Sequence, residues 1–401
     1  MSRQYFSGCQ AAAEGVTLSR PGVIAAYPIT PQSSIVEILA AKVANGEMSA
    51  QMVHVESEHS AMCACVGAAT VGARAFTATS GQGLAFMQEP VFWAAGLRLP
   101  IVMAVVNRSL LAPNTIFCDH QDSLSHRDSG WVQLYAESCQ EVLDSVIVAY
   151  KVAEDERVLL PVMVCLDGFF LSHLYEPVDV PPQVEVDAFL PKTAPKYPTL
   201  DPDHPRLLNV LAPPEYYTEF EYDKHRSLTG AGERLEEAFG EFAARFGRQY
   251  HNLEGFYLHG AKLVLVGMGS MMGTARAVVE QLRAQGVPIG LVKLRAFRPF
   301  PHAALTELLR GVEAVGVMDR DISFGSSGVL YQEVLRAFYR QERRPLVVDF
   351  VVGLGGRDVS AQTVHHAIVE LERVRREGAV TQDVVWSDAD RTLLSAWGLE
   401  I

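Results

Sequence analysis

Short apolar segments that predict buried strands alternate with segments of helical periodicity along most of this chain. From Gly22 to Asp167 the alternation runs through VIAAY, SSIVEILAAKVA, MVHV, HSAMCACVGAATVGA and RAFTATS, and it continues to LPIVMAVVN and LLPVMVCLD. Strands that are apolar throughout are buried on both faces, as in parallel sheets covered by helices. The alternation therefore predicts an α/β fold built on a parallel sheet.

A proline-rich segment separates this alternation from a second one. Residues 176–215 contain EPVDVPPQV, LPKTAPKYPTLDPDHP and APPEY, and proline has no N–H to donate to a sheet. A polar amphipathic helix, GERLEEAFGEFAARFG, follows before strands and helices alternate again from LVLVGMG to PLVVDFVVG. We expect a first α/β domain over 1–175, a surface connector with a linking helix over 176–258, and a second α/β domain over 259–401, since 401 residues exceed one ordinary core.

The composition excludes several classes of protein. A formal net charge of −13 opposes nucleic-acid binding, which requires concentrated Lys and Arg. No run of about 18 apolar residues predicts a membrane span, and MSRQYFSGCQAAAEG lacks the pattern of an export signal. The six cysteines include one close pair, Cys63 and Cys65, and no CxxC, whereas zinc and iron–sulfur sites need about four ligands. We expect an acidic cytoplasmic enzyme that carries no such site itself.

The turn YPITPQSS follows the first predicted strand of the alternation. Two prolines flank Ile29 and Thr30 before a helix begins. Ligands gather beyond the carboxyl ends of parallel strands, so the hydroxyl of Thr30 is a candidate for a hydrogen bond to a substrate. Capping of the helix by Thr30, with Pro31 at the first helical position, would explain the same residues.

Two acids precede the helix in VESEHSAMCACVGAA. Glu56 and Glu58 lie between a strand and a helix made almost entirely of small and apolar residues. Partial burial there would raise the pKa of a carboxylate and suit it to acid–base chemistry. The attraction of acids to a helix N-terminus is an equally good explanation.

Two further strands end in polar or flexible segments. FTATSGQGLAF places Ser80, Gly81 and Gly83 in a turn whose amides could face a ligand, although such turns are common without function. LPIVMAVVN runs into Arg108, whose planar guanidinium suits a carboxylate.

The following loop, DHQDSLSHRDSGW, is rich in ionisable side chains. His120 lies between Asp119 and Asp122 and is a candidate for proton exchange near neutral pH. The alternative is a polar loop that satisfies its own hydrogen bonds.

A glycine-rich turn, GMGSMMG, follows the first strand of the second alternation. Gly267, Gly269 and Gly273 resemble a dinucleotide-binding fingerprint, but their spacing differs by one residue and no clear acid ends the next strand. We therefore expect a tight strand-to-helix turn.

Together these strings resemble the α chains of 2-oxoacid:ferredoxin oxidoreductases, particularly the pyruvate and branched-chain types. The resemblance spans nearly the whole chain and includes YPITP, VESEHSA, FTATSGQGLA, LRLPIVMAVVNR, DHQDSLSHRDSGW, LPVMVCLDGF, GMGS, RAFRPFP and GLGGRDV. It implies a thiamine-diphosphate pyrimidine-type domain over 1–175, followed by a transketolase C-terminal-like domain over 259–401. The cofactor would lie between subunits.

The resemblance also implies roles for single residues. Glu58 would hydrogen-bond N1′ of the cofactor's aminopyrimidine, Thr30 would contact the oxoacid, Arg108 would bind its carboxylate, and Pro28 would shape the cofactor-facing turn. CLDGFF lacks the first glycine of the GDG motif that binds magnesium and diphosphate in thiamine enzymes. Mg²⁺, the diphosphate site and [4Fe-4S] clusters are thus expected on β, γ and δ partner subunits.

The implied activity is the oxidative decarboxylation of pyruvate with coenzyme A to acetyl-CoA and CO2, with electrons passed to ferredoxin. 2-Oxoisovalerate and 2-oxoglutarate are alternative substrates, because single methylenes discriminate by only about 1–3 kcal/mol. The β chain of a lipoamide-linked 2-oxoacid dehydrogenase and a non-catalytic scaffold subunit are other interpretations. The intact set of Thr30, Glu58 and Arg108 argues against the scaffold.

Overall fold

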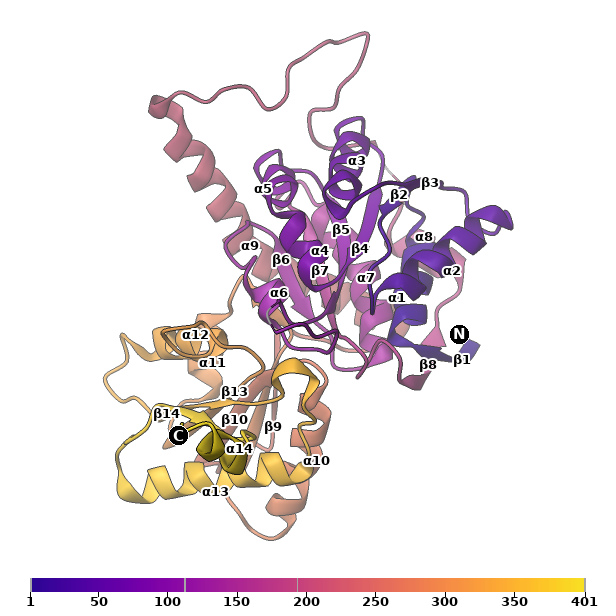
Figure 1. Cartoon of the computed structure of the whole chain (residues 1–401). Helices are drawn as coiled ribbons and strands as arrows, with labels where there is room; N and C mark the ends of the chain where they lie inside the picture. The colour runs from indigo at the N-terminus through magenta and orange to yellow at the C-terminus, as the bar shows by residue number, and fades with distance from the viewer. Residues whose placement is uncertain (1, 112, 193, 400–401) are drawn as a thin grey trace.

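The computed structural model describes residues 2–111, 113–192 and 194–399, which form two α/β bodies (Figure 1). The first body and the helix that leaves it contain, in chain order, β1 (Ser2–Ser7), α1 (Gly8–Ser19), β2 (Val23–Ala26), α2 (Ser33–Ala44), β3 (Gln51–His54), α3 (Glu58–Thr70), β4 (Ala75–Thr79), α4 (Gly81–Phe86), α5 (Gln88–Gly96), β5 (Ile101–Asn107), α6 (Gln121–Leu124), β6 (Val132–Tyr135), α7 (Cys139–Ala153), β7 (Val162–Asp167), β8 (Tyr175–Val180), α8 (Gln183–Phe189) and α9 (Pro214–Phe246).

The second body follows α9. It contains β9 (Leu253–Phe256), β10 (Leu263–Met268), α10 (Met271–Ala284), β11 (Ile289–Leu294), β12 (Ala296–Arg298), α11 (His302–Leu308), β13 (Ala314–Asp319), α12 (Val329–Phe338), β14 (Leu346–Val351), the short 3-10 helix η1 (Leu354–Gly356), α13 (Ala361–Glu377), β15 (Val384–Trp386) and α14 (Arg391–Ala396).

The first body is built on a seven-stranded sheet in the order β12-β6-β7-β5-β4-β2-β3. All of its strands are parallel except β12, which pairs antiparallel with β6. In β5, Val102 and Ala104 face the core beneath α1 and α7, whereas Met103 and Val105 face the core beneath α3 and α5. A strand that packs on both faces has no polar side, which explains the apolar runs and confirms the expected parallel α/β fold.

The second body has a six-stranded sheet in the order β15-β14-β13-β10-β11-β9, parallel except for β9. α10 and α13 cover one face, and α11 and α12 cover the other. β12 follows β11 in sequence but joins the edge of the first sheet, so the two bodies share backbone hydrogen bonds. The domain boundaries at 175 and 258 stay predictions; residues 1 and 401 lie outside the described residues.

The connector between the bodies differs in part from expectation. Its first residues form β8, which pairs with β1, and α8, which packs on α1. Residues 201–213, by contrast, extend away from the first body instead of lying over its surface (Figure 1). Among the described parts of the chain, no helix has both the length and the hydrophobicity needed to cross a bilayer.

Two buried carboxylates in the second body give its stability a pH dependence. Asp319 ends β13 and Asp349 lies in β14. Burial raises both pKa values, that of Asp349 to about 7, and repulsion from Asp349 adds to the effect on Asp319. The folded chain thus holds protons that unfolded aspartates, with a pKa of about 3.9, would release. This contribution to stability is complete below about pH 4 and is lost as the pH rises through about 7.

The variant Asp349→Asn tests this linkage. Asparagine keeps an acceptor for the Gly328 N–H, which lies 2.6 Å from Asp349 Oδ2, but carries no charge at any pH. We expect the melting temperature of the variant to fall less than that of the wild type between about pH 6 and about pH 8. Asp358→Asn, at an exposed position, is the matched control. Parallel pH profiles for Asp349→Asn and the wild type would contradict the assignment.

Candidate active site

Four segments that the sequence singled out meet at one edge of the seven-stranded sheet. Thr30 follows β2, Glu58 follows β3, Gly81 follows β4 and Arg108 follows β5. These strands are neighbours in the order β5-β4-β2-β3 and run parallel, so their carboxyl ends lie side by side. This is the edge where open α/β sheets bind ligands. Pro28 lies in the exposed turn between β2 and Thr30.

Glu58 is the first residue of α3 and is only 8% exposed. Ser57 caps the helix by accepting a hydrogen bond from the Ser60 N–H. The carboxylate lies against α4, where a Cβ on Gly83 would come within 2.8 Å of Glu58 Oε1. Glycine at position 83 therefore makes room for the acid. Glu56, in contrast, is exposed and accepts a hydrogen bond from the Ser60 hydroxyl.

Several polar atoms at this strand edge lack partners. Within the described chain no donor reaches the Glu58 carboxylate, and the buried Thr79 Oγ1, Ser80 Oγ and Gln82 Oε1 have no hydrogen-bond partner. Thr79 Oγ1 lies against Gly83 as Glu58 does, because a Cβ there would come within 2.5 Å of it. Buried polar groups are normally satisfied. An acceptor and hydroxyls left free at a strand edge fit a polar heterocycle such as an aminopyrimidine.

Arg108 and Thr30 are in direct contact. Arg108 Nη1 donates to the Thr30 carbonyl oxygen at 3.1 Å, and Arg108 Nε donates to the Thr115 carbonyl oxygen at 3.0 Å. Its third nitrogen, Nη2, has no acceptor among the residues that the structure describes. Partial burial lowers the pKa of Arg108, but a guanidinium stays charged in proteins. The guanidinium can therefore bind an anion beside Thr30.

Thr30 does not cap α2. The helix begins at Ser33 with Gln32 as its N-cap, and no side chain caps its N-terminus. Gln32 instead donates a hydrogen bond to the Ala78 carbonyl oxygen at 2.6 Å. The capping explanation is therefore wrong, and the hydroxyl of Thr30 is exposed at the site.

Asp122 holds this edge together, a function that the sequence did not reveal. Its buried carboxylate accepts hydrogen bonds from the backbone N–H groups of Gly81, Arg108 and Ser123 and from the Asn107 amide. Burial raises its pKa to about 6, although these donors oppose the shift. Gly81 has φ +46°, and a Cβ there would lie 3.1 Å from Arg108 Cδ. Asp122 thus fixes the turn on which Arg108 rests.

Asp167 joins the two bodies instead of facing the site. It is 1% exposed, accepts a hydrogen bond from the Ser270 N–H at 3.0 Å, and lies 2.8 Å from His120 Nε2 and 2.9 Å from Arg320 Nη1. Burial opposes ionisation, but the charges and hydrogen bonds of His120 and Arg320 outweigh it and hold the pKa of Asp167 well below its usual range. Asp167 therefore has a structural role in the contact between the two bodies.

The neighbours of Asp167 explain two other sequence patterns. His120 is fully buried with Nε2 2.8 Å from Asp167 Oδ1, so it lies in the contact between the bodies and not at the strand edge. The glycine-rich turn of the second body packs directly on this pair: Gly269 has φ +77°, and a Cβ there would lie 3.1 Å from Asp167 Oδ1. The turn is tight, as expected, and Asp167 lies where a nucleotide phosphate would have to bind. No group of metal-binding side chains converges anywhere in the described residues.

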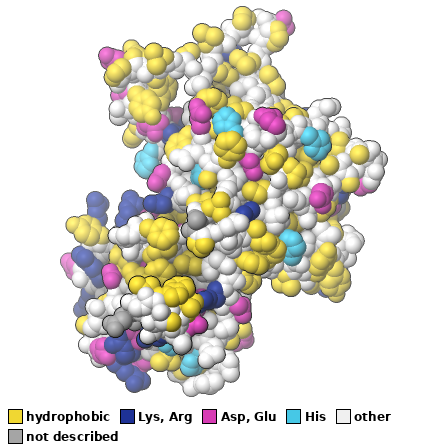
Figure 2. Space-filling view, viewed as in Figure 1, with side chains coloured by type: hydrophobic (Ala, Val, Ile, Leu, Met, Phe, Trp, Pro, Cys, Tyr) yellow, Lys and Arg dark blue, Asp and Glu magenta, His cyan; other side chains and the backbone are white. Residues whose placement is uncertain are grey.

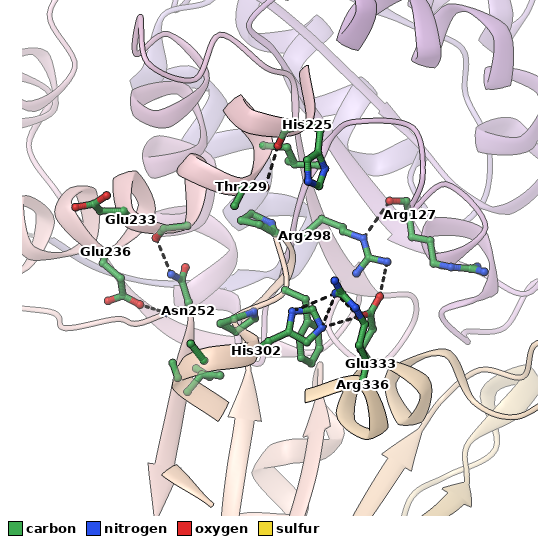
Figure 3. Close-up of a pocket in the computed structure, with 18 of the residues that line it drawn as sticks. Arg127, His225, Thr229, Glu233, Glu236, Asn252, Arg298, His302, Glu333 and Arg336 are labelled. Atoms are coloured by element: carbon green, nitrogen blue, oxygen red, sulfur yellow. Dashed lines mark hydrogen bonds and ion pairs between the residues drawn. The ribbon is translucent and has the colours of Figure 1, made fainter. Parts of the chain in front are cut away.

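A separate cavity of about 1060 Å³ lies between the bodies and α9 (Figure 3). Arg298 Nη2 and His302 Nε2 lie 2.7 Å and 2.9 Å from the carboxylate oxygens of Glu333. These side chains are already paired, and the lining includes none of Thr30, Glu58 and Arg108. The strand edge, not this cavity, is the candidate active site.

Two family models match most of the chain. Residues 14–239 match the model described as pyruvate flavodoxin/ferredoxin oxidoreductase, thiamine diP-bdg, and residues 261–364 match pyruvate:ferredoxin oxidoreductase core domain II. The chain belongs to the pyruvate:ferredoxin oxidoreductase family. The expected family is confirmed, as is the expectation of an oxidoreductase subunit that binds thiamine diphosphate.

Curated relatives agree with the family match. The pyruvate synthase subunit PorA of Methanothermobacter thermautotrophicus is 47% identical over 386 residues, which cover 96% of this chain and 98% of the relative. The ketoisovalerate oxidoreductase subunit VorA of Pyrococcus abyssi is 46% identical over 385 residues, which cover 96% and 97%. Because both relatives are named as subunits, a multi-subunit assembly is supported.

Solved structures share the fold. The 2-oxoglutarate:ferredoxin oxidoreductase from Magnetococcus marinus matches with a TM-score of 0.70 and 18% identity over 94% of this chain, which spans 65% of that longer chain. A split gene transketolase matches with a TM-score of 0.55 and 12% identity, over 93% of this chain and 100% of its own. The expected combination of a thiamine-diphosphate pyrimidine-type domain and a transketolase C-terminal-like domain is confirmed.

Proposed function

We propose that this chain is the α subunit of a pyruvate:ferredoxin oxidoreductase and binds the aminopyrimidine half of thiamine diphosphate through Glu58. The observation that carries the proposal is the Glu58 side chain, which is only 8% exposed and lies against Gly83 together with the free hydroxyl of Thr79. Bound thiamine diphosphate would supply the nucleophilic carbon that attacks the oxo group of the substrate. The diphosphate, its Mg²⁺ and the [4Fe-4S] clusters are assigned to the β, γ and δ subunits.

The residues of this chain have separate tasks in the proposal. Glu58 holds and exchanges a proton at the pyrimidine N1′, since a buried carboxylate without donors can share a proton with a ring nitrogen. Arg108 binds the carboxylate of the oxoacid through its free Nη2, and Thr30 orients the substrate with its hydroxyl. Pro28 shapes the turn that faces the cofactor. Coenzyme A accepts the acyl group, and ferredoxin accepts the electrons.

Arg108→Lys tests the substrate-binding part of the proposal. Lysine keeps the charge but loses the planar group that contacts a carboxylate through two nitrogens. A hydrogen bond to a charged group contributes about 1.5–3 kcal/mol, so we expect the KM for pyruvate to rise about 10- to 100-fold. The KM for coenzyme A should not change. Arg127→Lys, in the cavity between the bodies, is the matched control; an unchanged KM for pyruvate in Arg108→Lys would contradict the role.

The overall function is tested by assaying the purified complex with a panel of oxoacids, coenzyme A and ferredoxin. We expect ferredoxin reduction with pyruvate as the preferred substrate by kcat/KM. 2-Oxoisovalerate is the second candidate, because the VorA relative is nearly as similar as PorA. A higher kcat/KM with 2-oxoisovalerate or 2-oxoglutarate would show that pyruvate is not the preferred substrate. A lipoylated acceptor in place of ferredoxin would reject the enzyme class and favour the β chain of a lipoamide-linked dehydrogenase, and inactivity with every acceptor would favour a scaffold.

A further inference from the structure

A short segment of the first body links Arg108 to the second body. It comprises residues 115–122 and is called the strap. At its start, the Thr115 carbonyl oxygen accepts a hydrogen bond from Arg108 Nε at 3.0 Å. At its end, the Asp122 carboxylate accepts one from the Arg108 backbone N–H at 2.9 Å. The two ends of the strap therefore hold the side chain and the backbone of the same arginine.

The middle of the strap is bonded to the second body at three consecutive residues. The Cys118 carbonyl oxygen accepts a hydrogen bond from the Gly356 N–H at 2.6 Å, and Asp119 Oδ2 accepts one from the Gly355 N–H at 3.3 Å. The backbone N–H of His120 donates at 2.9 Å to a carbonyl oxygen just after β13. All three strap residues are buried. Because a shift of the strap would leave these buried groups without partners, the second body fixes its path.

Gly356 lies against the strap without room for a side chain. It ends the sequence Gly-Leu-Gly-Gly at 353–356, called the GLGG turn, and has φ +81°, a conformation that favours glycine. A Cβ at this position would clash with Phe117 Cβ and lie 3.4 Å from the Cys118 nitrogen. The ring of Phe117 packs on that of Phe169, with 5.2 Å between the centroids. The strap therefore has the GLGG turn on one side and an aromatic contact on the other.

Asp119 connects the GLGG turn to the residue that follows Arg108. Its buried carboxylate accepts hydrogen bonds from the Ser109 hydroxyl and from the Gly355 N–H. The Ser109 N–H also donates to the Phe117 carbonyl oxygen in the strap at 3.0 Å. A displacement of the GLGG turn would thus reach the backbone beside Arg108 through one carboxylate.

The second body is itself held firmly against the first. One hydrophobic cluster contains buried side chains from both bodies, and hydrophobic side chains line their junction on the face shown in Figure 2. β12 adds backbone hydrogen bonds to β6 across the same junction. The GLGG turn is therefore a fixed support for the strap.

We propose that the GLGG turn of the second body positions the guanidinium of Arg108 for the carboxylate of the oxoacid, and that it acts through the strap. The inference rests on the proposed function, which assigns that carboxylate to Arg108. Gly355, Gly356 and Asp119 are positioning residues, because they act through Arg108 and not on the substrate. A misplacement of about 1 Å in a substrate-binding group can cost about 10²-fold. The second body thereby contributes to the affinity for the oxoacid.

The first test is Gly356→Ala, assayed in the purified, assembled complex. The added Cβ must displace the strap, so we expect the KM for pyruvate to rise about tenfold. The KM for coenzyme A and kcat should stay within about twofold of the wild type, because only the binding of the oxoacid is affected. A general loss of stability would instead lower the active fraction, and so kcat, for every substrate.

Gly378→Ala is the matched control. Gly378 ends α13 with φ +71°, and a Cβ there would meet no atom within 4 Å. Alanine therefore adopts the same left-handed conformation at this position without touching the strap. The KM for pyruvate should stay at the wild-type value. An equal KM for pyruvate in Gly356→Ala and Gly378→Ala would overturn the proposal, as would a loss of kcat in Gly356→Ala with an unchanged KM.

Asp119→Ala tests the same link from the first body and does not depend on the folding of Gly356→Ala. It removes the acceptor shared by Ser109 and Gly355, so we expect a rise of about tenfold in the KM for pyruvate. Asp119→Asn keeps an acceptor oxygen and should restore most of the affinity. A wild-type KM in Asp119→Ala would overturn the proposal. Failure of the proposed function is distinguishable, because it appears as an unchanged KM for pyruvate in Arg108→Lys itself.

Discussion

Glu58→Gln is expected to reduce the turnover of the assembled enzyme by about 10²- to 10⁴-fold, the range that one general acid–base group contributes. Glutamine has almost the same shape and fits beside Gly83, so the fold and the assembly should be unchanged. It cannot take up and release a proton at a ring nitrogen. The measurements are kcat with pyruvate and the affinity for thiamine diphosphate by titration calorimetry.

Glu56→Gln is the matched control for this prediction. The two acids lie on either side of the N-cap Ser57, but Glu56 is exposed and hydrogen-bonded to Ser60, outside the site. We expect its turnover to stay within about twofold of the wild type, as for most exposed substitutions. Wild-type turnover and cofactor affinity in Glu58→Gln would remove Glu58 from the mechanism. An equal loss of turnover in Glu56→Gln would attribute the effect to the N-terminus of α3 as a whole and not to Glu58.

The sequence predicted the location of the candidate site for a geometric reason. Thr30, Glu58, Gly81 and Arg108 each follow an apolar strand, and parallel strands present their carboxyl ends at one edge. The choice between Glu56 and Glu58 could not be made from the segment alone, because both acids suit a helix N-terminus. Burial against Gly83 distinguishes them, and that contact joins α3 to α4, two helices that follow different strands of the sheet.

The side-chain contacts that hold the site together could not be predicted from the sequence. Asp122 reaches Gly81 and Arg108 only because a loop folds back on the sheet edge. Asp167 resembled part of a magnesium motif, yet its partners Ser270 and Arg320 lie more than a hundred residues further along the chain. A local pattern contains no information about such pairings.

The connection between the bodies shows the same limit at the level of the backbone. β12 comes between β11 and α11 in sequence, so the alternation assigns it to the second body. It pairs instead with β6, while Lys293 and Arg295 just before it bind the buried Glu141 of α7. The strand and these ion pairs fix the second body against the first. Periodicity predicts that a segment is a strand but does not predict the sheet that it joins.

Asp167→Asn is expected to lower the stability of the chain by about 3–5 kcal/mol, the usual effect of removing one partner from a buried ion pair. Arg320 is 1% exposed and would lose its carboxylate, while its remaining acceptors are the backbone carbonyls of Gly353 and Arg357. The measurement is chemical unfolding of the complex, followed by the fluorescence of this chain. Asp128→Asn, at an exposed position on the same body, is the control and should change stability by less than about 0.5 kcal/mol.

The double variant Asp167→Asn with Arg320→Met separates the loss of the ion pair from the cost of an unpaired charge. Methionine fills part of the volume of arginine and needs no counter-ion, so the double variant should be more stable than Asp167→Asn alone. Additive losses would show that Asp167 acts mainly through Ser270 and His120. If the double variant regains stability, the ion pair between Asp167 and Arg320 determines how the second body is held against the active-site edge.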